Sequence, residues 1–413
     1  MVEKVIKAIK EGVFFQKLFR KLYCVFVVAI VKKVVLLFPI QKNKIIFSNF
    51  SGRGFGDSPA CIAKELLKSS ENYDIVWVVN NADEKLPPKV RAVKYMSVKC
   101  FYEFATAKVW VDNVRSTCRP AKRDSQFYLQ TYHGEGVVKF VEKDVEEKLS
   151  PQYVKSAKLD GASCNAIIAG NQIIYNMMLT SFWLNPQTEI LRIGLPCNDF
   201  FFDKAYCKAV RDKLITQFGV KDGECIVLYA PTFRDNNATD CYITEFDRLA
   251  AAFEKRENKK CRIFVRFHPN MHEYSKSLDL GENVTDVTEY PEIHDLFFIS
   301  DYMISDYSSV AVGFSEFIRK PVFLYTPDLE DYEKQRGLHH AYFSYPFLRA
   351  SSFDSLLKTI AEFDSAEYHK KESDFFQNNV MYDNGNASKK AAALIKNQLT
   401  GNSNTQVKRQ TKM

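Results

Sequence analysis

Short apolar runs that alternate with helix-like runs fill the chain from Lys44 onward and constrain its fold more than any other feature. Each short apolar run is predicted as a buried strand, and the run that follows it has apolar residues at helical spacing. This alternation is typical of parallel sheets whose connecting helices cover both faces, so the predicted fold class is α/β. With 413 residues, the chain is long enough for two such domains.

Eleven strands are predicted from these runs: 44–47, 74–79, 90–94, 109–112, 127–131 and 166–169 in the first half, and 225–229, 262–267, 284–287, 302–305 and 322–325 in the second. Helices are predicted at 57–67, 98–107, 171–180 and 203–218, with two or three more within 353–399. A charged stretch at 142–159 breaks the alternation and is interpreted as an insertion or a mobile helix.

A turn-rich segment from Gly194 to Asp199 separates the two series of strands. We therefore predict four regions: a basic and apolar segment at 1–43, a Rossmann-like domain at 44–200, a second Rossmann-like domain at 201–399, and a disordered polar tail at 400–413.

The net charge of +7 is concentrated at the N-terminus. Residues 1–53 hold 11 Lys or Arg and 2 Asp or Glu, whereas the remainder holds 46 and 48. This pattern argues against nucleic-acid binding and favours an amphipathic helix on an anionic membrane surface. A helix packed on the protein's own core and a tilted membrane span are the alternatives, although the uninterrupted apolar run at 22–31 is too short to span a bilayer.

The ten cysteines are scattered, without a Cys-x-x-Cys pair or a zinc-type Cys/His spacing. They are predicted to be free thiols in a reducing cytosol, and no metal site can be argued from spacing. No convincing export signal precedes the first strand, because two lysines stand where a small-residue cleavage site is expected.

Four predicted strands end in polar residues, and carboxyl ends of parallel strands gather at one edge of a sheet, where ligands bind. The four ends are Tyr132-His133-Gly134-Glu135, Thr232-Phe233-Arg234-Asp235, Arg266-Phe267-His268-Pro269 and Asp306-Tyr307-Ser308-Ser309. If the two sheets face each other, these ends line one cleft.

His133 is the candidate general base, because imidazole accepts a proton near neutral pH and Gly134 allows a substrate to approach the backbone. A purely structural histidine is the alternative. Asp306 to Ser309 stand where a strand stops and a helix begins, a geometry that caps a helix and also favours phosphate.

Thr232, Arg234, Arg266 and His268 supply hydrogen-bonding and cationic groups suited to phosphate oxygens. A Walker loop, an Asp-x-Asp pair and a Gly-x-Ser-x-Gly elbow are all missing from the sequence. The glycine-rich stretch at 51–57 lacks the dinucleotide spacing and is interpreted as a tight turn between a strand and a helix.

Six motifs occur in a fixed order: Tyr-His-Gly at 132–134, Gly-Leu-Pro-Cys-Asn-Asp at 194–199, Leu-Tyr-Ala-Pro-Thr-Phe-Arg-Asp at 228–235, Arg-Phe-His-Pro at 266–269, Ser-Asp-Tyr-Ser-Ser at 305–309, and the stretch from Lys-Pro-Val-Phe-Leu-Tyr to Arg-Gly at 320–337. Together they resemble the CDP-glycerol glycerophosphotransferase family of teichoic acid primases and polymerases. The resemblance covers about 45–345 and is strongest from 190 onward.

The resemblance implies a GT-B arrangement, in which two Rossmann-like domains face each other across a cleft, and peripheral attachment to the cytoplasmic face of the cell membrane. It implies that glycerol phosphate passes from CDP-glycerol to a hydroxyl of a lipid-linked teichoic-acid-like or capsular polymer acceptor, with release of CMP. His133 is then the base on that hydroxyl, and His268, a second catalytic residue, holds the CDP pyrophosphate together with Ser308 and Ser309. No cofactor is expected, while a metal requirement and the oligomeric state stay open.

Two departures from the family pattern concern the acceptor. Glu135-Gly136-Val137 stands where Thr-Pro-Leu is common, and Cys197 replaces a usual arginine. Gly134, Glu135 and Asn198 are therefore predicted on the acceptor side. The alternatives are CDP-ribitol as donor, a GT-B glycosyltransferase that uses a sugar nucleotide, and a non-catalytic relative.

Overall fold

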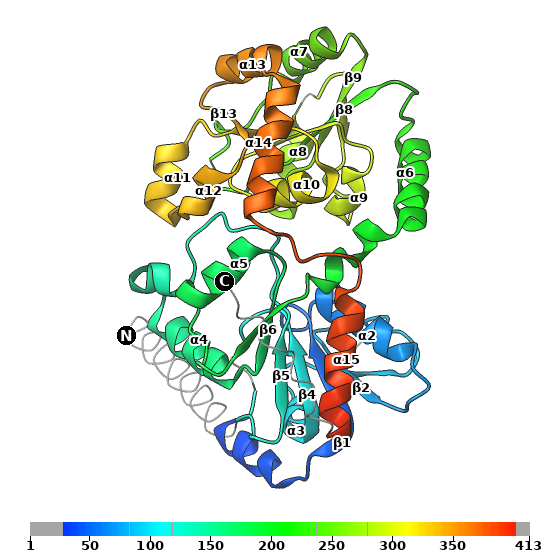
Figure 1. Ribbon diagram of the computed structural model, residues 1–413, viewed down its shortest axis with the longest axis vertical. Coiled ribbons are helices and arrows are strands. Elements are labelled where there is room, and N and C mark those ends of the chain that lie inside the picture. The colour runs from blue at the N-terminus through cyan, green and yellow to red at the C-terminus, as the bar shows by residue number, and fades with distance from the viewer. Residues whose placement is uncertain (1–27, 82, 117–118, 236–237, 279, 402–413) are drawn as a thin grey trace, which may run out of the picture.

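Two parallel sheets form two domains that are stacked along the long axis of the molecule (Figure 1). The structure, a computed structural model, describes residues 28–81, 83–116, 119–235, 238–278 and 280–401. The amphipathic helix predicted near the N-terminus and most of the predicted tail lie outside these residues.

The N-terminal sheet has the strand order β3-β2-β1-β4-β5-β6-β7. Its strands are β1 (Gln41–Ser48), β2 (Asp74–Val79), β3 (Val90–Lys94), β4 (Ala107–Asp112), β5 (Phe127–Gln130), β6 (Ala166–Ala169) and β7 (Glu189–Arg192). Its helical segments are η1 (Val35–Leu37), α2 (Asp57–Leu67), α3 (Val98–Thr106), η2 (Glu142–Lys148), α4 (Pro151–Ser163), α5 (Gln172–Ser181) and η3 (Pro196–Phe202). The central strands are buried almost throughout because helices cover both faces.

The C-terminal sheet has the strand order β10-β9-β8-β11-β12-β13. Its strands are β8 (Cys225–Tyr229), β9 (Cys261–Val265), β10 (Val284–Asp286), β11 (Tyr302–Ser305), β12 (Val322–Tyr325) and β13 (Leu348–Ala350). The helical segments of the second half are α6 (Lys204–Phe218), α7 (Phe246–Glu257), η4 (Pro269–Met271), α8 (His272–Ser277), α9 (Ile293–Phe297), α10 (Val310–Ile318), α11 (Leu329–Arg336), α12 (His340–Ser344), α13 (Phe353–Glu362), α14 (Ser365–Asn378) and α15 (Ala387–Thr400).

Both sheets reverse their strand order beside their first strand, between β1 and β4 and between β8 and β11. In a doubly wound sheet, this reversal opens a crevice at the carboxyl ends of the strands, where ligands bind. The polar strand ends that the sequence singled out at 306–309 and 230–235 follow the strands at the C-terminal crevice, and those at 132–135 follow β5, next to β4.

The stretch at 142–159 is not an insertion. It forms η2 and most of α4, and α4 is the crossover helix that joins β5 to the adjacent parallel strand β6. Its outer face meets solvent, so the stretch carries many charged residues that obscure the helical spacing of its apolar ones. The edge strands β7 and β13 were not predicted, since they are short and β7 carries exposed charges at Glu189 and Arg192.

Helix α15 leaves the C-terminal half and returns to the first sheet, as the red helix in Figure 1 shows. Ala391, Ala392 and Ile395 pack into the core that α2 forms with the N-terminal strands. The Asp199 carboxylate caps this helix by accepting 2.8 Å hydrogen bonds from the backbone N–H groups of Ala387 and Ser388. We predicted residues 201–399 as one domain from their order in the sequence. Helix α15 lies within this range but packs on the N-terminal domain.

Candidate active site

His133 stands at the end of β5 with its imidazole exposed. Its Nδ1 lies 2.6 Å from the backbone oxygen of Asn113. A carbonyl oxygen only accepts, so Nδ1 carries the hydrogen and Nε2 of the neutral ring keeps its lone pair. The flanking residues Tyr132 and Gly134 have φ angles of 61° and 147°, and this unusual backbone turns the imidazole out of the sheet. The Nε2 lone pair is therefore free to accept a proton.

Asn113 fixes this orientation, and the sequence analysis missed it. Its side chain donates to Asn49 Oδ1 and accepts from the Phe50 N–H, both at 2.8 Å. The Phe50 ring lies 5.1 Å from the imidazole, edge to face. Asn49 and Asn113 follow β1 and β4 directly, so the strand-end signal that found His133 was present in both.

Asp57, at the start of α2, belongs to the same edge of the sheet. Burial raises the pKa of its carboxyl, and the nearby Ser58 N–H and the charge of His133 oppose that rise. The glycine-rich turn at 51–57, interpreted from sequence as an ordinary connection, therefore borders the base.

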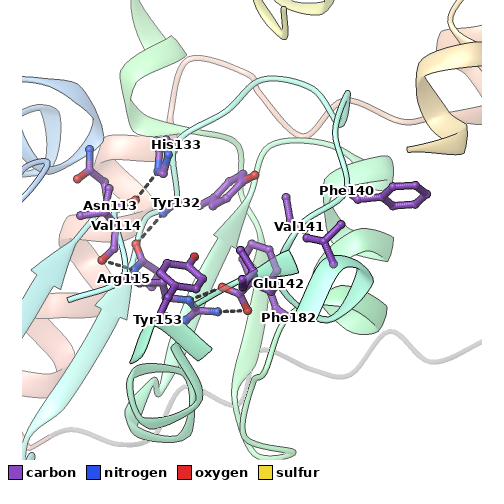
Figure 2. A pocket seen from close by; sticks show the side chains of 13 residues that line it. Asn113, Val114, Arg115, Tyr132, His133, Phe140, Val141, Glu142, Tyr153 and Phe182 are labelled. Atoms are coloured by element: carbon purple, nitrogen blue, oxygen red, sulfur yellow. Dashed lines mark hydrogen bonds and ion pairs between the residues drawn. The ribbon is translucent and has the colours of Figure 1, made fainter. Parts of the chain in front are cut away.

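A cavity of about 420 Å³ opens beside His133 (Figure 2). Its walls come from the segment after β4, from the end of β5, from η2 and the start of α4, and from the end of α5. The lining residues are Asn113, Val114, Arg115, Gln130, Tyr132, His133, Phe140, Val141, Glu142, Val145, Leu149, Tyr153 and Phe182. The cavity thus lies mainly within the N-terminal domain, and one of its lining residues, Phe140, also contacts His339 of the second half.

In the C-terminal half, Asp306 is held by the loop that follows β8. It accepts from the Thr232 N–H at 2.9 and 3.0 Å and from the Thr232 hydroxyl at 2.5 Å. Arg234 Nη1 lies 2.9 Å from Asp306 Oδ2. The structure therefore brings together three residues that the sequence placed at the phosphate site.

Arg234 is only 5% exposed, and protein oxygens take up its donors. Nε and Nη2 donate to the Asp328 carboxylate at 2.7 and 3.2 Å, and Nη1 also donates to the Thr232 carbonyl at 2.6 Å. Tyr307 donates to the same Asp328 carboxylate at 3.0 Å. In this arrangement Arg234 holds two loops together instead of presenting a fork to the cleft.

Ser308 and Ser309 stand half-exposed before the first turn of α10. The Ser308 hydroxyl accepts from the Val310 N–H at 3.3 Å. This helix start therefore offers hydroxyls and N–H groups of the kind that bind phosphate.

His268 is exposed, and its Nδ1 accepts from the Asn270 N–H at 3.2 Å, so Nε2 carries the hydrogen. Burial and the neighbouring Arg266 lower the pKa of His268, which favours a neutral donor. Arg266 itself donates to the Tyr290 carbonyl at 3.1 Å, and its buried Nε has no hydrogen-bond partner among the described residues.

The chain after His133 crosses to the other domain over residues 134–141, which we call the crossing segment. Glu135 Oε1 lies 2.5 Å from His294 Nε2 on α9. Gly313 on α10 admits this carboxylate, because a Cβ there would overlap it, and Gly136 packs against Val312 in the same way. The segment that follows His133 is thus tied to the helix that begins after Ser309.

The remaining predicted acceptor residues do not line the cavity. Glu135 is buried in its pair with His294, which sequence reasoning missed because that histidine follows no strand. Asn198 is 3% exposed, and its side chain hydrogen-bonds Asp383, whose pKa burial raises to about 7. Asn198 therefore supports the return of the chain to the first domain.

No helix among the described residues is long and apolar enough to cross a membrane. Within the same residues, no three His, Cys, Asp or Glu side chains are grouped to hold a metal ion. The absence of a cofactor stays a prediction.

A family model matches most of this chain. Residues 30–397 match the model of the family described as CDP-Glycerol:Poly(glycerophosphate) glycerophosphotransferase. The chain is 27% identical over 372 residues to the teichoic acid poly(glycerol phosphate) polymerase of Staphylococcus epidermidis, covering 86% of this chain and 51% of that protein. It is 25% identical over 370 residues to the teichoic acid glycerol-phosphate transferase of Staphylococcus aureus, covering 86% and 93%. The chain thus spans only about half of the first relative and nearly all of the second.

Solved structures agree with this relation. The wall teichoic acid polymerase TagF superposes with a TM-score of 0.75 at 25% identity, covering 95% of this chain and 98% of that chain. Staphylococcus aureus MnaA with UDP gives 0.53 at 13% identity, over 86% of this chain and 97% of that chain, which shows a shared fold alone. The predicted GT-B-like pair of Rossmann-like domains is confirmed. Because the family match spans nearly the whole sequence, this chain belongs to the CDP-glycerol:poly(glycerophosphate) glycerophosphotransferase family.

Proposed function

We propose that this chain transfers glycerol phosphate from CDP-glycerol to an acceptor hydroxyl, with His133 as general base and release of CMP. The observation that carries the proposal is the exposed His133 imidazole, whose Nδ1 is bound to the Asn113 carbonyl and whose Nε2 is left to accept a proton. The crossing segment joins this base to α10, whose first turn follows Ser308 and Ser309.

In the proposed reaction, the acceptor oxygen attacks the β-phosphorus of CDP-glycerol while its proton passes to His133 Nε2. A new oxygen–phosphorus bond forms, and the bond from the β-phosphorus to the oxygen that bridges the two phosphates breaks. The electron pair leaves with CMP. Such transfers depend on positioning and charge neutralisation, which the start of α10 and a His268 N–H donor supply.

Relatives support this chemistry and leave the polyol open. Structures of TagF include histidine-to-asparagine variants soaked with CDPG. A teichoic acid poly(ribitol-phosphate) polymerase of Bacillus spizizenii is 26% identical to this chain, so CDP-ribitol is the alternative donor.

The test measures CMP release from CDP-glycerol and from CDP-ribitol, with membranes as the source of acceptor. We expect release from CDP-glycerol that depends on His133 and on the membranes. Thermal stabilisation by UDP or GDP but not by CDP would instead indicate a sugar-nucleotide glycosyltransferase. CDP binding without any CMP release would indicate a non-catalytic relative.

We further propose peripheral attachment to an anionic membrane surface, on the cytoplasmic face. An apolar group is exposed where the described chain begins: Ile30, Val34, Leu37 and Phe38 are 45%, 48%, 83% and 45% exposed. Lys33 is exposed among them. Apolar side chains beside basic ones match an interfacial anchor.

Removal of residues 1–40 is expected to release the protein from vesicles that contain anionic lipid. The paired replacement of Leu37 and Phe38 by glutamate should weaken binding without a change in fold, because both side chains are exposed. Persistence of binding in the truncated protein would place the attachment surface elsewhere.

A further inference from the structure

The walls of the cavity beside His133 are mainly apolar, which a phosphate-bearing ligand does not require. Aromatic rings of Tyr132, Phe140, Tyr153 and Phe182 and the aliphatic side chains of Val145 and Leu149 form most of its surface. Its volume of about 420 Å³ lies in the range of small-molecule sites. The cavity is therefore large enough for a whole unit of the acceptor and presents it mainly with apolar surface.

The cavity also lacks an uncompensated positive charge. Arg115 is the only lysine or arginine among its thirteen lining residues, all of which the structure describes. Its Nε and Nη2 donate to the Glu142 carboxylate at 2.7 and 3.1 Å, and its Nη1 donates to Asp160 at 3.2 Å. Figure 2 shows this pair at the base of the cavity. An anion placed there would meet the Glu142 carboxylate and a guanidinium that Glu142 and the buried Asp160 already neutralise.

Two phenolic hydroxyls are left for hydrogen bonding. Neither Tyr132 nor Tyr153 has a hydrogen-bond partner for its hydroxyl among the described residues, and Tyr153 is 41% exposed. Burial raises the pKa of Tyr132 to about 12, so this phenol remains a donor at neutral pH. The site thus combines aromatic faces with a few neutral polar groups.

We infer that the cavity binds an uncharged saccharide unit, and that this unit carries or adjoins the hydroxyl that His133 deprotonates. A sugar ring has an apolar C–H face that packs on aromatic rings and hydroxyls that meet the phenols. A polyol phosphate repeat would bring a negative charge into a mostly apolar site with no free cation, which is unfavourable. The chain therefore places polyol phosphate on a saccharide end and does not extend a phosphate polymer; this inference rests on the proposed function.

The test compares acceptors in CMP release from CDP-glycerol. One set consists of octyl glycosides of hexoses, N-acetylhexosamines and their disaccharides, and the other consists of the same glycosides bearing one glycerol phosphate on the terminal sugar. We expect kcat/KM for the best plain glycoside to exceed that of its phosphate-bearing form at least tenfold. Use of the charged acceptors alone, or at equal efficiency, overturns the inference and leaves the proposed function standing. CDP binding with no CMP release from either set, or with membranes, overturns both.

Substitutions in the cavity wall test whether the preference for the uncharged glycoside arises there. Tyr153→Ala should raise KM for the glycoside about tenfold and leave KM for CDP-glycerol unchanged, while Tyr153→Phe should retain most of the affinity because the ring remains. Leu159→Ala is the matched control, since Leu159 lies on the same helix, is 65% exposed and does not line the cavity. An unchanged KM for the glycoside in Tyr153→Ala contradicts the inference.

A second variant tests the charge argument by gain of function. Val145→Lys adds a cation to the cavity wall and should shift the preference toward the phosphate-bearing glycoside by about tenfold. If the ratio of the two kcat/KM values stays as in the wild type, the absence of a cation does not set the specificity.

Discussion

The two halves of the candidate site use their polar residues in different ways. On the N-terminal side, His133 is exposed beside an open cavity, and one hydrogen bond to the Asn113 carbonyl orients it. On the C-terminal side, Asp306 and Arg234 are 3% and 5% exposed and bind each other and neighbouring loops. The first half thus leaves a side-chain nitrogen exposed beside a cavity, whereas the polar side chains of the second half largely satisfy one another.

Polar side chains at strand ends therefore follow one of two patterns: they stay available to a ligand, or they bind one another. Where one side chain meets one backbone group, as at His133, a functional atom stays available. Where a carboxylate meets an arginine and a hydroxyl, as at Asp306, the atoms satisfy each other, and the backbone and serines of the following helix remain for the ligand.

The largest expected effect is on His133. His133→Ala should lower CMP release by about 10²- to 10⁴-fold, the usual range for removal of a general base. Binding of CDP, measured by calorimetry, should remain, because His133 belongs to the N-terminal half. His369→Ala serves as control, since its side chain is 49% exposed on α14. Activity that survives in His133→Ala would show that the exposed group is not the base.

Arg234→Met tests whether the C-terminal network is internal. Loss of the guanidinium leaves the buried Asp306 and the partly exposed Asp328 near each other without a cation, which should cost about 3–5 kcal/mol of stability. Chemical denaturation measures this loss. The control Arg336→Met removes an exposed pair with Asp235 and should cost at most about 1 kcal/mol. Unchanged stability with weaker CDP binding would make Arg234 a direct phosphate ligand and break the contrast between the halves.

His294→Gln tests the link between the halves through its pH dependence. Burial lowers the pKa of His294, but Glu135 and Glu292 outweigh burial and raise this pKa to about 10, from an ordinary value of 6.5. The folded protein therefore holds a proton that the unfolded chain has lost, so this stabilisation is complete below about pH 6.5 and disappears as pH rises through 10.

Melting temperatures between pH 6 and 10 check this expectation. The wild type should lose more stability across that window than His294→Gln, and His369→Gln should follow the wild type. Parallel curves for wild type and His294→Gln would show that the Glu135–His294 contact does not contribute to the stability of the domain pair.

The smallest expected effect concerns Asp199, a motif residue that caps a helix. Asp199→Ala removes two hydrogen bonds to the start of α15 and should cost about 1–2 kcal/mol, visible as faster amide exchange in that helix. Asp203→Ala removes the comparable cap of α6, and its effect should stay within the second half. A loss of CMP release at normal stability in Asp199→Ala would give this motif a direct functional role.

The sequence predicted the fold well wherever a strand is buried on both faces. Runs such as Ile75 to Val79 contain only apolar residues because helices cover both sides, and their boundaries are correspondingly clear. Glu189 to Arg192 lies at an edge with charges exposed, so its composition does not mark a strand.

Site residues were predictable where they follow a buried strand, as His133 and Asp306 do. Their roles were not, because a role depends on the partner that the fold supplies from far along the chain. Arg234 meets Asp328, 94 residues away, and Glu135 meets His294 on the other domain. The residues around Arg234 and Glu135 in the sequence do not indicate these distant partners.

The return of α15 to the first domain limits how the two halves move. Besides the crossing segment, the chain passes between the domains after η3 and before α15, and these two passages touch where Gly385 packs against Phe202. Together with the crossing segment, these adjacent links restrict the relative rotation of the two halves. We infer that the gap between His133 and the helix that follows Ser309 widens only if the crossing segment leaves α9 and α10.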